Sequence, residues 1–583
     1  MDNSGIGGLE RIRQDAWLQT ALKFLRENAT TANLVGLIGG VCALLILLAP
    51  LPEAWNMRLP FYLVIFVWTI LRPRVALYLM PIAVPWGSLD IIALGGLNLN
   101  SADVLVGFLA AGWLMSFALR PAGQLGTSMN ETGPRDRVAF NSSNVSIYLI
   151  WAIIILLGTM LLSMMAAINI SSSLKEVSKW LEFLVVVLLG AQYIRTRRQI
   201  WTIIVLVCLA GITQAIYGYL QAFFNLGPEA FIRDTSLRVY GTFDQPNPFA
   251  GYINLPLSIA LALMLLGSNW RTRILAGITV VFLAEAEYLT QSRGGEVALA
   301  VAALFIVIVG MPYLRRLIGL LALAGLGVVE VFFAGWIPEY VLTPVFKYLG
   351  LTQISFVNPG SADFSTAERL AHWIAGIHMF LNHPLTGVGI GNYPDAYPRY
   401  FITIFVNSLG HAHNYYINIA AETGAIGLTA YLLFLMAIFV TGGSAFQAIS
   451  KKYTQVKAQR SKELPQTQTE LLQSRGCRGL CPLPGFEVSP IFPFLKGGWV
   501  GKSSPGPQGT NEVKNILKND RALAVGLLAA LISICVHNLV DDLYVHSLTN
   551  LMALLLIVLI RLEGVTTKVG GNGGYFDYTK LAR

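Results

Sequence analysis

Long apolar runs dominate the chain, and short polar segments separate them. Residues 34–51, 145–167 and 296–314 are each about long enough to cross ~30 Å of hydrocarbon as a helix. Because lipid cannot hydrogen-bond to a peptide backbone, such runs must be helical. The runs do not alternate between polar and apolar positions, as strands of a transmembrane barrel would. The pattern therefore predicts an all-α polytopic membrane protein.

Hydropathy predicts about 12–14 transmembrane helices. The fourteen candidate spans lie near residues 33–51, 57–71, 75–96, 103–119, 145–167, 175–194, 199–224, 247–268, 274–291, 296–314, 316–336, 412–445, 522–540 and 544–561. The spacing of apolar residues within 366–383 predicts a further helix on the membrane surface, closed by Pro384.

The spans and the polar segments divide the chain into seven parts. We expect a cytoplasmic N-terminal tail at 1–32 without a cleavable signal peptide, helices 1–11 at 33–336, a long outer, periplasmic loop at 337–411, helix 12 at 412–446, a disordered cytoplasmic insert at 447–520, helices 13 and 14 at 521–561, and a cytoplasmic tail at 562–583. Polar residues and a Gly/Ser/Pro-rich stretch suggest disorder in the insert.

The charge pattern supports this topology. Only 13% of the residues are charged, mean hydropathy is +0.59, and the formal net charge is +9. If the N-terminus is cytoplasmic, 32 of the 41 Lys and Arg residues fall on the cytoplasmic side. This is the asymmetry of plasma-membrane proteins, so the basic composition does not call for a nucleic-acid partner.

Five polar clusters fall on the predicted outer face, which suggests one site there. They lie in segments 236–252, 289–296, 366–393, 411–414 and 536–546. Each also has a plainer interpretation: Arg238 at the lipid headgroups, Arg293 at a helix turn, Gly387, Gly389 and Gly391 in a tight bend, and Asp541 with Asp542 in a polar hairpin. His411 and His413 would point apart on a helix, so a metal shared by both would require extended backbone.

Four ordered stretches resemble the O-antigen ligase and polymerase superfamily. They are "RVYGTFDQPNPFAGYI", "LTQSRGGEVALA", "ERLAHWIAGIHMFLNHPLTGVGIGNY" and "HAHNYYINIAAETGAIGLTAYL". The resemblance covers roughly residues 200–445, and the last two spans fit it more loosely. It implies a multi-pass plasma-membrane enzyme that moves a glycan from an undecaprenyl diphosphate carrier onto an acceptor hydroxyl on the outer side.

The resemblance also implies roles for particular residues. The arginines of the family match Arg238 and Arg293, and its loop histidine matches His413. Ligases of this kind are thought to need no metal, so we expect neither metal nor cofactor. The chain departs from the expected pattern at Glu285 and Glu287, which lie below Arg293 where apolar residues were expected and which could weaken its positive charge.

The physical chemistry of the reaction agrees with these roles. A diphosphate leaving group suits two arginines, which bind it through charge-assisted hydrogen bonds, and neutral imidazole suits the removal of a proton from the acceptor hydroxyl. We therefore expect His413, Arg293 and Arg238 to be catalytic and the reaction to invert the anomeric carbon. The expected substrate-binding residues are Arg369, Asn414, His411, Trp373 and Tyr393.

Two alternatives remain for the function. A polymerase of the same superfamily would use another lipid-linked repeat unit as acceptor, where a ligase uses a glycolipid. A transporter, including the inorganic-carbon type, would be compatible with many spans, but its ionisable residues should lie near the bilayer midplane. Most candidates here lie at the predicted outer surface. The expected partners are thus the lipid-linked oligosaccharide, a glycolipid or glycan acceptor, and membrane lipids.

Overall fold

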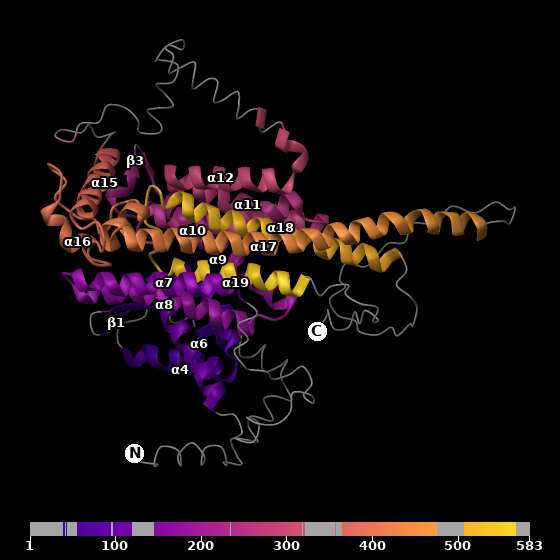
Figure 1. Cartoon of the computed structure of the whole chain (residues 1–583), viewed down its shortest axis with the longest axis horizontal. Coiled ribbons are helices and arrows are strands. Elements are labelled where there is room, and N and C mark those ends of the chain that lie inside the picture. The colour runs from indigo at the N-terminus through magenta and orange to yellow at the C-terminus, as the bar shows by residue number, and fades with distance from the viewer. Residues whose placement is uncertain are drawn as a thin grey trace, which may run out of the picture.

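A computed structural model describes most of the chain and shows a bundle of long helices (Figure 1). The described residues are 39–40, 42–43, 55–94, 97–118, 145–233, 235–316, 319–320, 356, 364–474 and 507–566. Within them, seven helices are long and apolar enough to cross a membrane. The fold is therefore all-α and polytopic, as predicted.

The helices are α4 (Trp55–Leu71), α5 (Arg74–Trp86), α6 (Ser101–Ala118), α7 (Ile147–Ser163), α8 (Ile170–Tyr193), α9 (Arg197–Phe224), α10 (Pro246–Leu266), α11 (Trp270–Thr290), α12 (Arg293–Gly310), α15 (Phe364–Asn382), α16 (Tyr393–Ala396), α17 (Tyr415–Ser474), α18 (Pro507–His537) and α19 (Leu548–Thr566). Two antiparallel hairpins accompany them: β1 (Ile91–Leu94) with β2 (Leu97–Asn100), and β3 (Ile232–Arg233) with β4 (Ser236–Leu237).

One predicted span, 75–96, is shorter than expected. Its helix α5 ends at Trp86, and a 3-10 turn and the β1–β2 hairpin follow. Hydropathy merged these elements because Ile91–Leu94 is as apolar as a helix interior. The other predicted spans are helical over most of their described residues and non-helical at some of their ends, as at 412–414, 538–540 and 544–547. Most of 33–51 and of 316–336 lies outside the described residues.

The bundle has two chemically different ends. At one end, Arg197 at the start of α9 pairs with buried Asp520 of α18, whose carboxylate also accepts from Thr566 of α19. At the opposite end, at the left of Figure 1, lie α15, α16 and β3. We call this second end the site end, because the polar clusters predicted from the sequence meet there.

The loop after α15 is anchored to a break in α17. Gly424 interrupts the helix with a left-handed φ of 67°. The backbone N–H groups of Val388 and Gly389 donate to the carbonyl oxygens of Ala421 and Glu422 just before the break. A Cβ on Gly387 would lie 2.2 Å from the Glu422 backbone. The glycine-rich stretch is thus a tight bend, as predicted, and it holds α15 and its following loop against α17.

The segment expected to be disordered is helical at both ends. Helix α17 continues to Ser474 and α18 begins at Pro507, so only 475–506 lies outside the described residues. In Figure 1, α17 extends well beyond the bundle on the side away from the site. Polar composition misled the prediction because Lys, Gln and Glu are also good helix formers.

Aromatic packing fixes the site end of the bundle. The buried Trp180 ring of α8 lies 5.1 Å from the Tyr544 ring and 5.4 Å from the Phe434 ring. Tyr415, the first residue of α17, packs edge-on against Tyr544 at 4.5 Å. These contacts hold the start of α17 against the turn at 538–547, which connects α18 to α19.

Candidate active site

His413 lies in a short loop that ends where α17 begins. Its backbone has a left-handed φ of 50°, so the loop is not the helical turn that the sequence suggested. The N–H of Ala412 donates to Asn418 Oδ1 at 3.0 Å, and the Trp373 indole N–H donates to the carbonyl of His413 at 3.1 Å. Contacts from α15 and α17 therefore fix the backbone on both sides of the ring.

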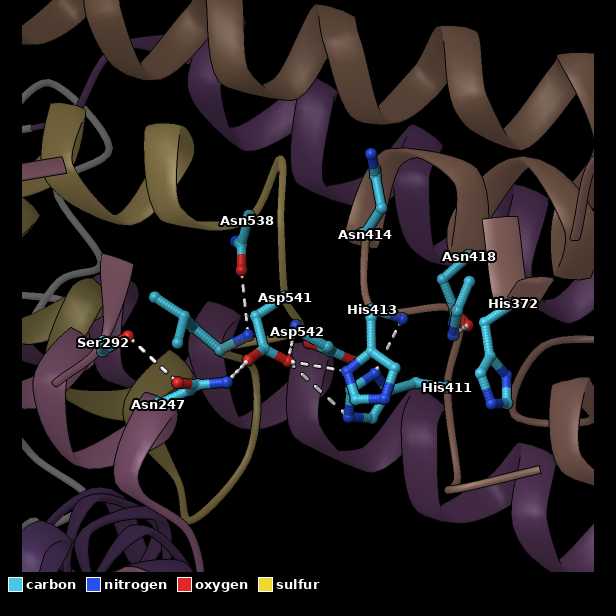
Figure 2. A network of polar contacts seen from close by, with 12 residues as sticks. Asn247, Ser292, His372, His411, His413, Asn414, Asn418, Asn538, Asp541 and Asp542 are labelled. Atoms are coloured by element: carbon cyan, nitrogen blue, oxygen red, sulfur yellow. Dashed lines mark hydrogen bonds and ion pairs between the residues drawn. The ribbon is translucent and has the colours of Figure 1, made fainter. Parts of the chain in front are cut away.

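Asn414 caps α17 and does not orient the His413 ring. Its Oδ1 accepts from the backbone N–H groups of Tyr416 at 3.0 Å and Ile417 at 3.1 Å, which is the geometry of a helix N-cap. Its Nδ2 donates to the carbonyl of Leu539 at 2.8 Å. In Figure 2 its side chain points away from His413. Asn414 thus ties α17 to the 538–547 turn.

The carboxylate beside His413 comes from Asp541, in the 538–547 turn. His413 Nδ1 lies 3.4 Å from Asp541 Oδ1, and because a carboxylate only accepts, Nδ1 carries the hydrogen. The Asp542 N–H donates to the same oxygen at 2.9 Å, and Asn247 Nδ2 donates to Oδ2 at 2.6 Å. Figure 2 shows Asp541 between Asn247 and the two histidines. Nε2 of His413 is left as the nitrogen that accepts a proton.

The two neighbouring carboxyl groups of the turn differ in their ionisation. Burial would raise the pKa of Asp541, but the hydrogen bond and charge of His413, with His411 and Arg369, hold it well below its usual range. Burial instead raises the pKa of Asp542 to about 7, although Lys179 opposes the rise. Asp541 is therefore the carboxylate that stays ionised next to His413.

His411, His413 and Asp541 offer potential metal ligand atoms that all lie within 4.8 Å of one another. However, His411 Nδ1 accepts the backbone N–H of His413 at 3.0 Å, so the hydrogen of the neutral ring is on Nε2. This is the nitrogen that faces Asp541, at 3.9 Å. A metal bound there would need Nε2 without its hydrogen and Nδ1 with one. The backbone bond disfavours that tautomer, so the cluster fits a shared metal poorly.

Arg238 and Ser292 connect the arginine segments to the same site. Arg238 donates from Nε to the carbonyl of Thr290 at 3.0 Å and from Nη2 to Asn247 Oδ1 at 3.2 Å. Ser292 is the N-cap of α12: its Oγ accepts from Gly295 N and donates to Asn247 Oδ1 at 3.0 Å. Arg293 is the first residue of α12, so its charge lies at the positive end of that helix.

Four arginines together give the site a strongly positive field. Burial, together with the charges of Arg233, Arg369 and Arg293, lowers the pKa of Arg238 to about 10, and the charge of Asp541 opposes this decrease. Arg238 still carries its proton at neutral pH. Of the four, Arg233 in β3 was not predicted from the sequence. Such a concentration of guanidinium groups suits a multiply charged anion.

The chain departs from the expected pattern at Glu285 and Glu287, and these two residues have different surroundings. Glu285 is exposed on the side of α11 that also presents Val281 and Phe282. Glu287 is buried, and its Oε1 accepts from Asn254 Nδ2 at 3.3 Å. Both lie in the helix below the turn at Thr290 that Arg238 contacts.

Two of the expected substrate-binding residues, Arg369 and Tyr393, lie in different surroundings. Arg369 is half-buried, and its charge influences both Arg238 and Asp541, so it lies at the site. Tyr393 is fully buried and donates to the backbone of His372, whose ring stacks on Tyr397 at 4.7 Å. Burial, with the nearby charge of His413, lowers the pKa of His372 to about 4. Tyr393 therefore belongs to the packing that supports the site.

The sequence analysis missed Asn247 and Ser292. For Asp541 it left two interpretations open, a residue of the site or part of a polar hairpin. Asn247 lies between Pro246 and Pro248 at the start of α10, which suggested only how that helix begins. Its amide nevertheless contacts Arg238, Ser292 and Asp541. The only feature of the sequence that could have indicated Asn247 is its polar side chain at the start of a mostly apolar helix, on the predicted outer face.

Comparison with known proteins gives one match. Residues 278–432 match the protein family described as O-antigen ligase. No curated protein matches the chain. The matched segment contains Arg293, Arg369 and His413, whereas Arg238, Asn247 and Asp541 lie outside it. This match agrees with the four ordered motifs and the polytopic helical fold, and residues 278–432 are similar to the O-antigen ligase family.

Proposed function

We propose that this protein transfers a glycan from an undecaprenyl diphosphate carrier to an acceptor hydroxyl at the outer face of the plasma membrane. The observation that carries the proposal is the His413–Asp541 pair, joined through Asn247 to Arg238. A base and an anion-binding group in one network are what glycosyl transfer from a diphosphate requires. The match of residues 278–432 to the O-antigen ligase family supports the same reaction class.

The proton transfer is assigned to His413. Its Nδ1–H is directed at the ionised Asp541, so Nε2 removes the proton from the acceptor hydroxyl as that oxygen attacks the anomeric carbon. The bond from that carbon to the diphosphate oxygen breaks in the same step, and its electron pair leaves with the carrier diphosphate. A single displacement of this kind inverts the anomeric carbon. The buried Asp541 stabilises the imidazolium that forms.

The leaving group is assigned to the arginines. The bonds to Thr290 and Asn247 use two of the five N–H donors of Arg238, and its remaining donors are assigned to phosphate oxygens. Arg293 adds a second charge at the N-terminus of α12, a position that favours anions. Both groups act most strongly when the negative charge of the diphosphate develops in the transition state.

The ligase assignment is favoured over the polymerase on the family description alone. A deletion strain separates the two. Loss of all long surface glycan with accumulation of carrier-linked chains supports a ligase, whereas a single repeat unit on the acceptor supports a polymerase. Normal surface glycan with altered solute uptake would contradict glycosyl transfer and favour transport.

Purified protein tests the chemistry directly. With carrier-linked oligosaccharide as donor and a glycolipid as acceptor, His413→Ala should lower kcat by about 10²- to 10⁴-fold, while donor binding remains. Arg238→Ala and Arg293→Ala should each weaken donor use by about 10- to 150-fold, the value of a charge-assisted hydrogen bond. Arg399→Ala is the matched control, because Arg399 is exposed on the same loop as Tyr397. Full activity of both arginine variants would contradict the diphosphate assignment.

A further inference from the structure

Asn247 contacts Arg238, the N-cap of α12 and the carboxylate that faces His413. Its Oδ1 accepts from Arg238 Nη2 at 3.2 Å and from Ser292 Oγ at 3.0 Å. Its Nδ2 donates to Asp541 Oδ2 at 2.6 Å. The side chain is 9% exposed, so water does not replace these partners easily. One amide therefore connects the arginine side of the site to the carboxylate that faces His413.

The partners fix the orientation of this amide. An arginine only donates and a carboxylate only accepts, so the carbonyl oxygen must face Arg238 and the nitrogen must face Asp541. Ser292 agrees, because its oxygen accepts from Gly295 N and its own hydrogen is left for Asn247. Only a side chain that both accepts and donates at fixed positions satisfies both charged neighbours.

The start of α10 leaves this side chain available. Pro246 and Pro248 have no N–H, so two of the unpaired donors of the first helical turn do not exist. No side chain caps α10, and the helix begins without using the Asn247 amide. The two prolines also restrict the backbone on either side of Asn247, which fixes the direction in which its side chain leaves the helix.

We propose that Asn247 is a positioning residue that couples occupation of the arginine site to the alignment of the His413–Asp541 pair. This inference rests on the proposed function. Arg238 and Ser292 donate to the amide oxygen, and the amide nitrogen donates to Asp541 Oδ2. His413 Nδ1 donates to the other carboxylate oxygen, so the hydrogen bonds from both sides converge on Asp541. When a diphosphate binds Arg238, the hydrogen bond between Arg238 and Asn247 changes. The Asn247 amide then shifts, and its hydrogen bond to Asp541 changes as well.

The informative variant is Asn247→Asp, which is nearly the same shape. When the new carboxyl group is protonated, it donates to Asp541 as the amide does, and His413 stays aligned. When it ionises, two carboxylates face each other at hydrogen-bond distance and repel. The pH profile of kcat should therefore gain a descending limb as pH rises, which the parent lacks, and donor KM should change at the same pH because Arg238 then faces a carboxylate.

Two further variants complete the test. Asn247→Ala should lower kcat by about 10- to 100-fold, since it removes a hydrogen bond to a charged group, without adding a limb to the profile. Asn550→Asp is the matched control, because buried Asn550 of α19 donates from Nδ2 to Glu182 Oε2 at 2.7 Å. It carries the same change beside another carboxylate and should leave the shape of the pH profile unchanged.

The outcomes separate this inference from the proposed function. All variants are compared by thermal stability and by gel filtration in detergent, so a misfolded variant is recognised before its kinetics are compared. A parental pH profile in well-folded Asn247→Asp overturns the coupling, provided that His413→Ala is inactive and the parent transfers glycan. A parent that transfers no glycan from any carrier-linked donor overturns the proposed function instead. The same new limb in Asn550→Asp would also overturn the coupling, because the effect would then not be specific to position 247.

Discussion

Replacing Asp541 with Asn changes one oxygen to an NH₂ group and should still nearly abolish transfer. The carboxylate accepts on both sides: Asn247 Nδ2 donates to Oδ2, and His413 Nδ1 and the Asp542 N–H face Oδ1. An amide at position 541 can accept on one side only. In either orientation, one donor of the site therefore meets another donor.

The consequence for His413 can be worked out from these contacts. If the new amide directs its oxygen at Asn247, its NH₂ group faces His413 Nδ1 and favours the tautomer with hydrogen on Nε2. That tautomer cannot remove the proton from the acceptor hydroxyl. A positioned base contributes about 10²- to 10⁴-fold, which corresponds to about 2.7–5.4 kcal/mol at 1.36 kcal/mol per factor of ten. Asp541→Asn should lose most of this.

The assay is single-turnover transfer from carrier-linked oligosaccharide at saturating acceptor. Asp542→Asn is the neighbouring control: the amide oxygen can still accept the Tyr544 N–H as the carboxylate does, at 2.9 Å, so its effect should be small. The double variant of Asp541→Asn with His413→Ala should be no slower than His413→Ala, because residues that act as a unit are not additive. Transfer by Asp541→Asn within about threefold of the parent, with His413→Ala inactive, would refute the reasoning.

An exchange variant tests the direction of the hydrogen bonds. Asn247→Asp combined with Asp541→Asn places the carboxylate at 247 and the amide at 541. The amide nitrogen then donates to the carboxylate, while its oxygen again faces His413 Nδ1 and the Asp542 N–H. The combination should transfer faster than Asp541→Asn alone. If the combined variant is slower than both single variants, the rate depends on having the negative charge at position 541 and not on the alignment of His413.

Three further predictions follow from the surroundings of the site. Burial lowers the pKa of both His372 and His411 to about 4. Between that value and about 6.5 the unfolded chain binds more protons, so the thermal midpoint should fall as pH falls through this window, and less so in His372→Phe. Gly294→Ala would place a Cβ 2.6 Å from Val540 Cγ2 and 3.0 Å from the His537 ring. It should therefore cost about 1–3 kcal/mol of stability and lower kcat, whereas Gly443→Ala in open space should do neither. Asn414→Ala should lower the thermal midpoint through loss of the α17 cap, about 1 kcal/mol, whereas Asn414→Asp should retain the cap; equal midpoints for the two would contradict the capping role.

The helical bundle was predictable because lipid imposes one rule on every span. An apolar run of about twenty residues has no alternative to a helix in hydrocarbon, so the predicted starts of α7 to α12 lie within a few residues of the observed ones. The rule failed at 75–96, where α5 ends at Trp86 and the hairpin β1–β2 follows. It failed there because hydropathy measures the composition of a segment and not the hydrogen bonds of its backbone.

The site was predictable only where a charged or ring side chain stood out against apolar neighbours. Arg238, Arg293 and His413 were named because they match the arginines and the loop histidine of the family that the motifs resemble. The structure places the carboxylate of Asp541, and not the neighbouring Asn414 side chain, beside Nδ1 of His413. The left-handed backbone of His413 separates its ring from the Asn414 side chain, and no local pattern in the sequence announces such a conformation.

The remaining contacts depend on segments that are far apart along the chain. Asn247 and Asp541 are separated by 294 positions, yet their side chains are 2.6 Å apart. The segment that matches the O-antigen ligase family ends at residue 432, before the turn that supplies Asp541. The matched segment thus contains His413 without the carboxylate that its Nδ1 faces. If Asp541 acts as proposed, helices α18 and α19 are part of the catalytic unit even though their sequences fit the family more loosely, because together they hold the 538–547 turn against the start of α17.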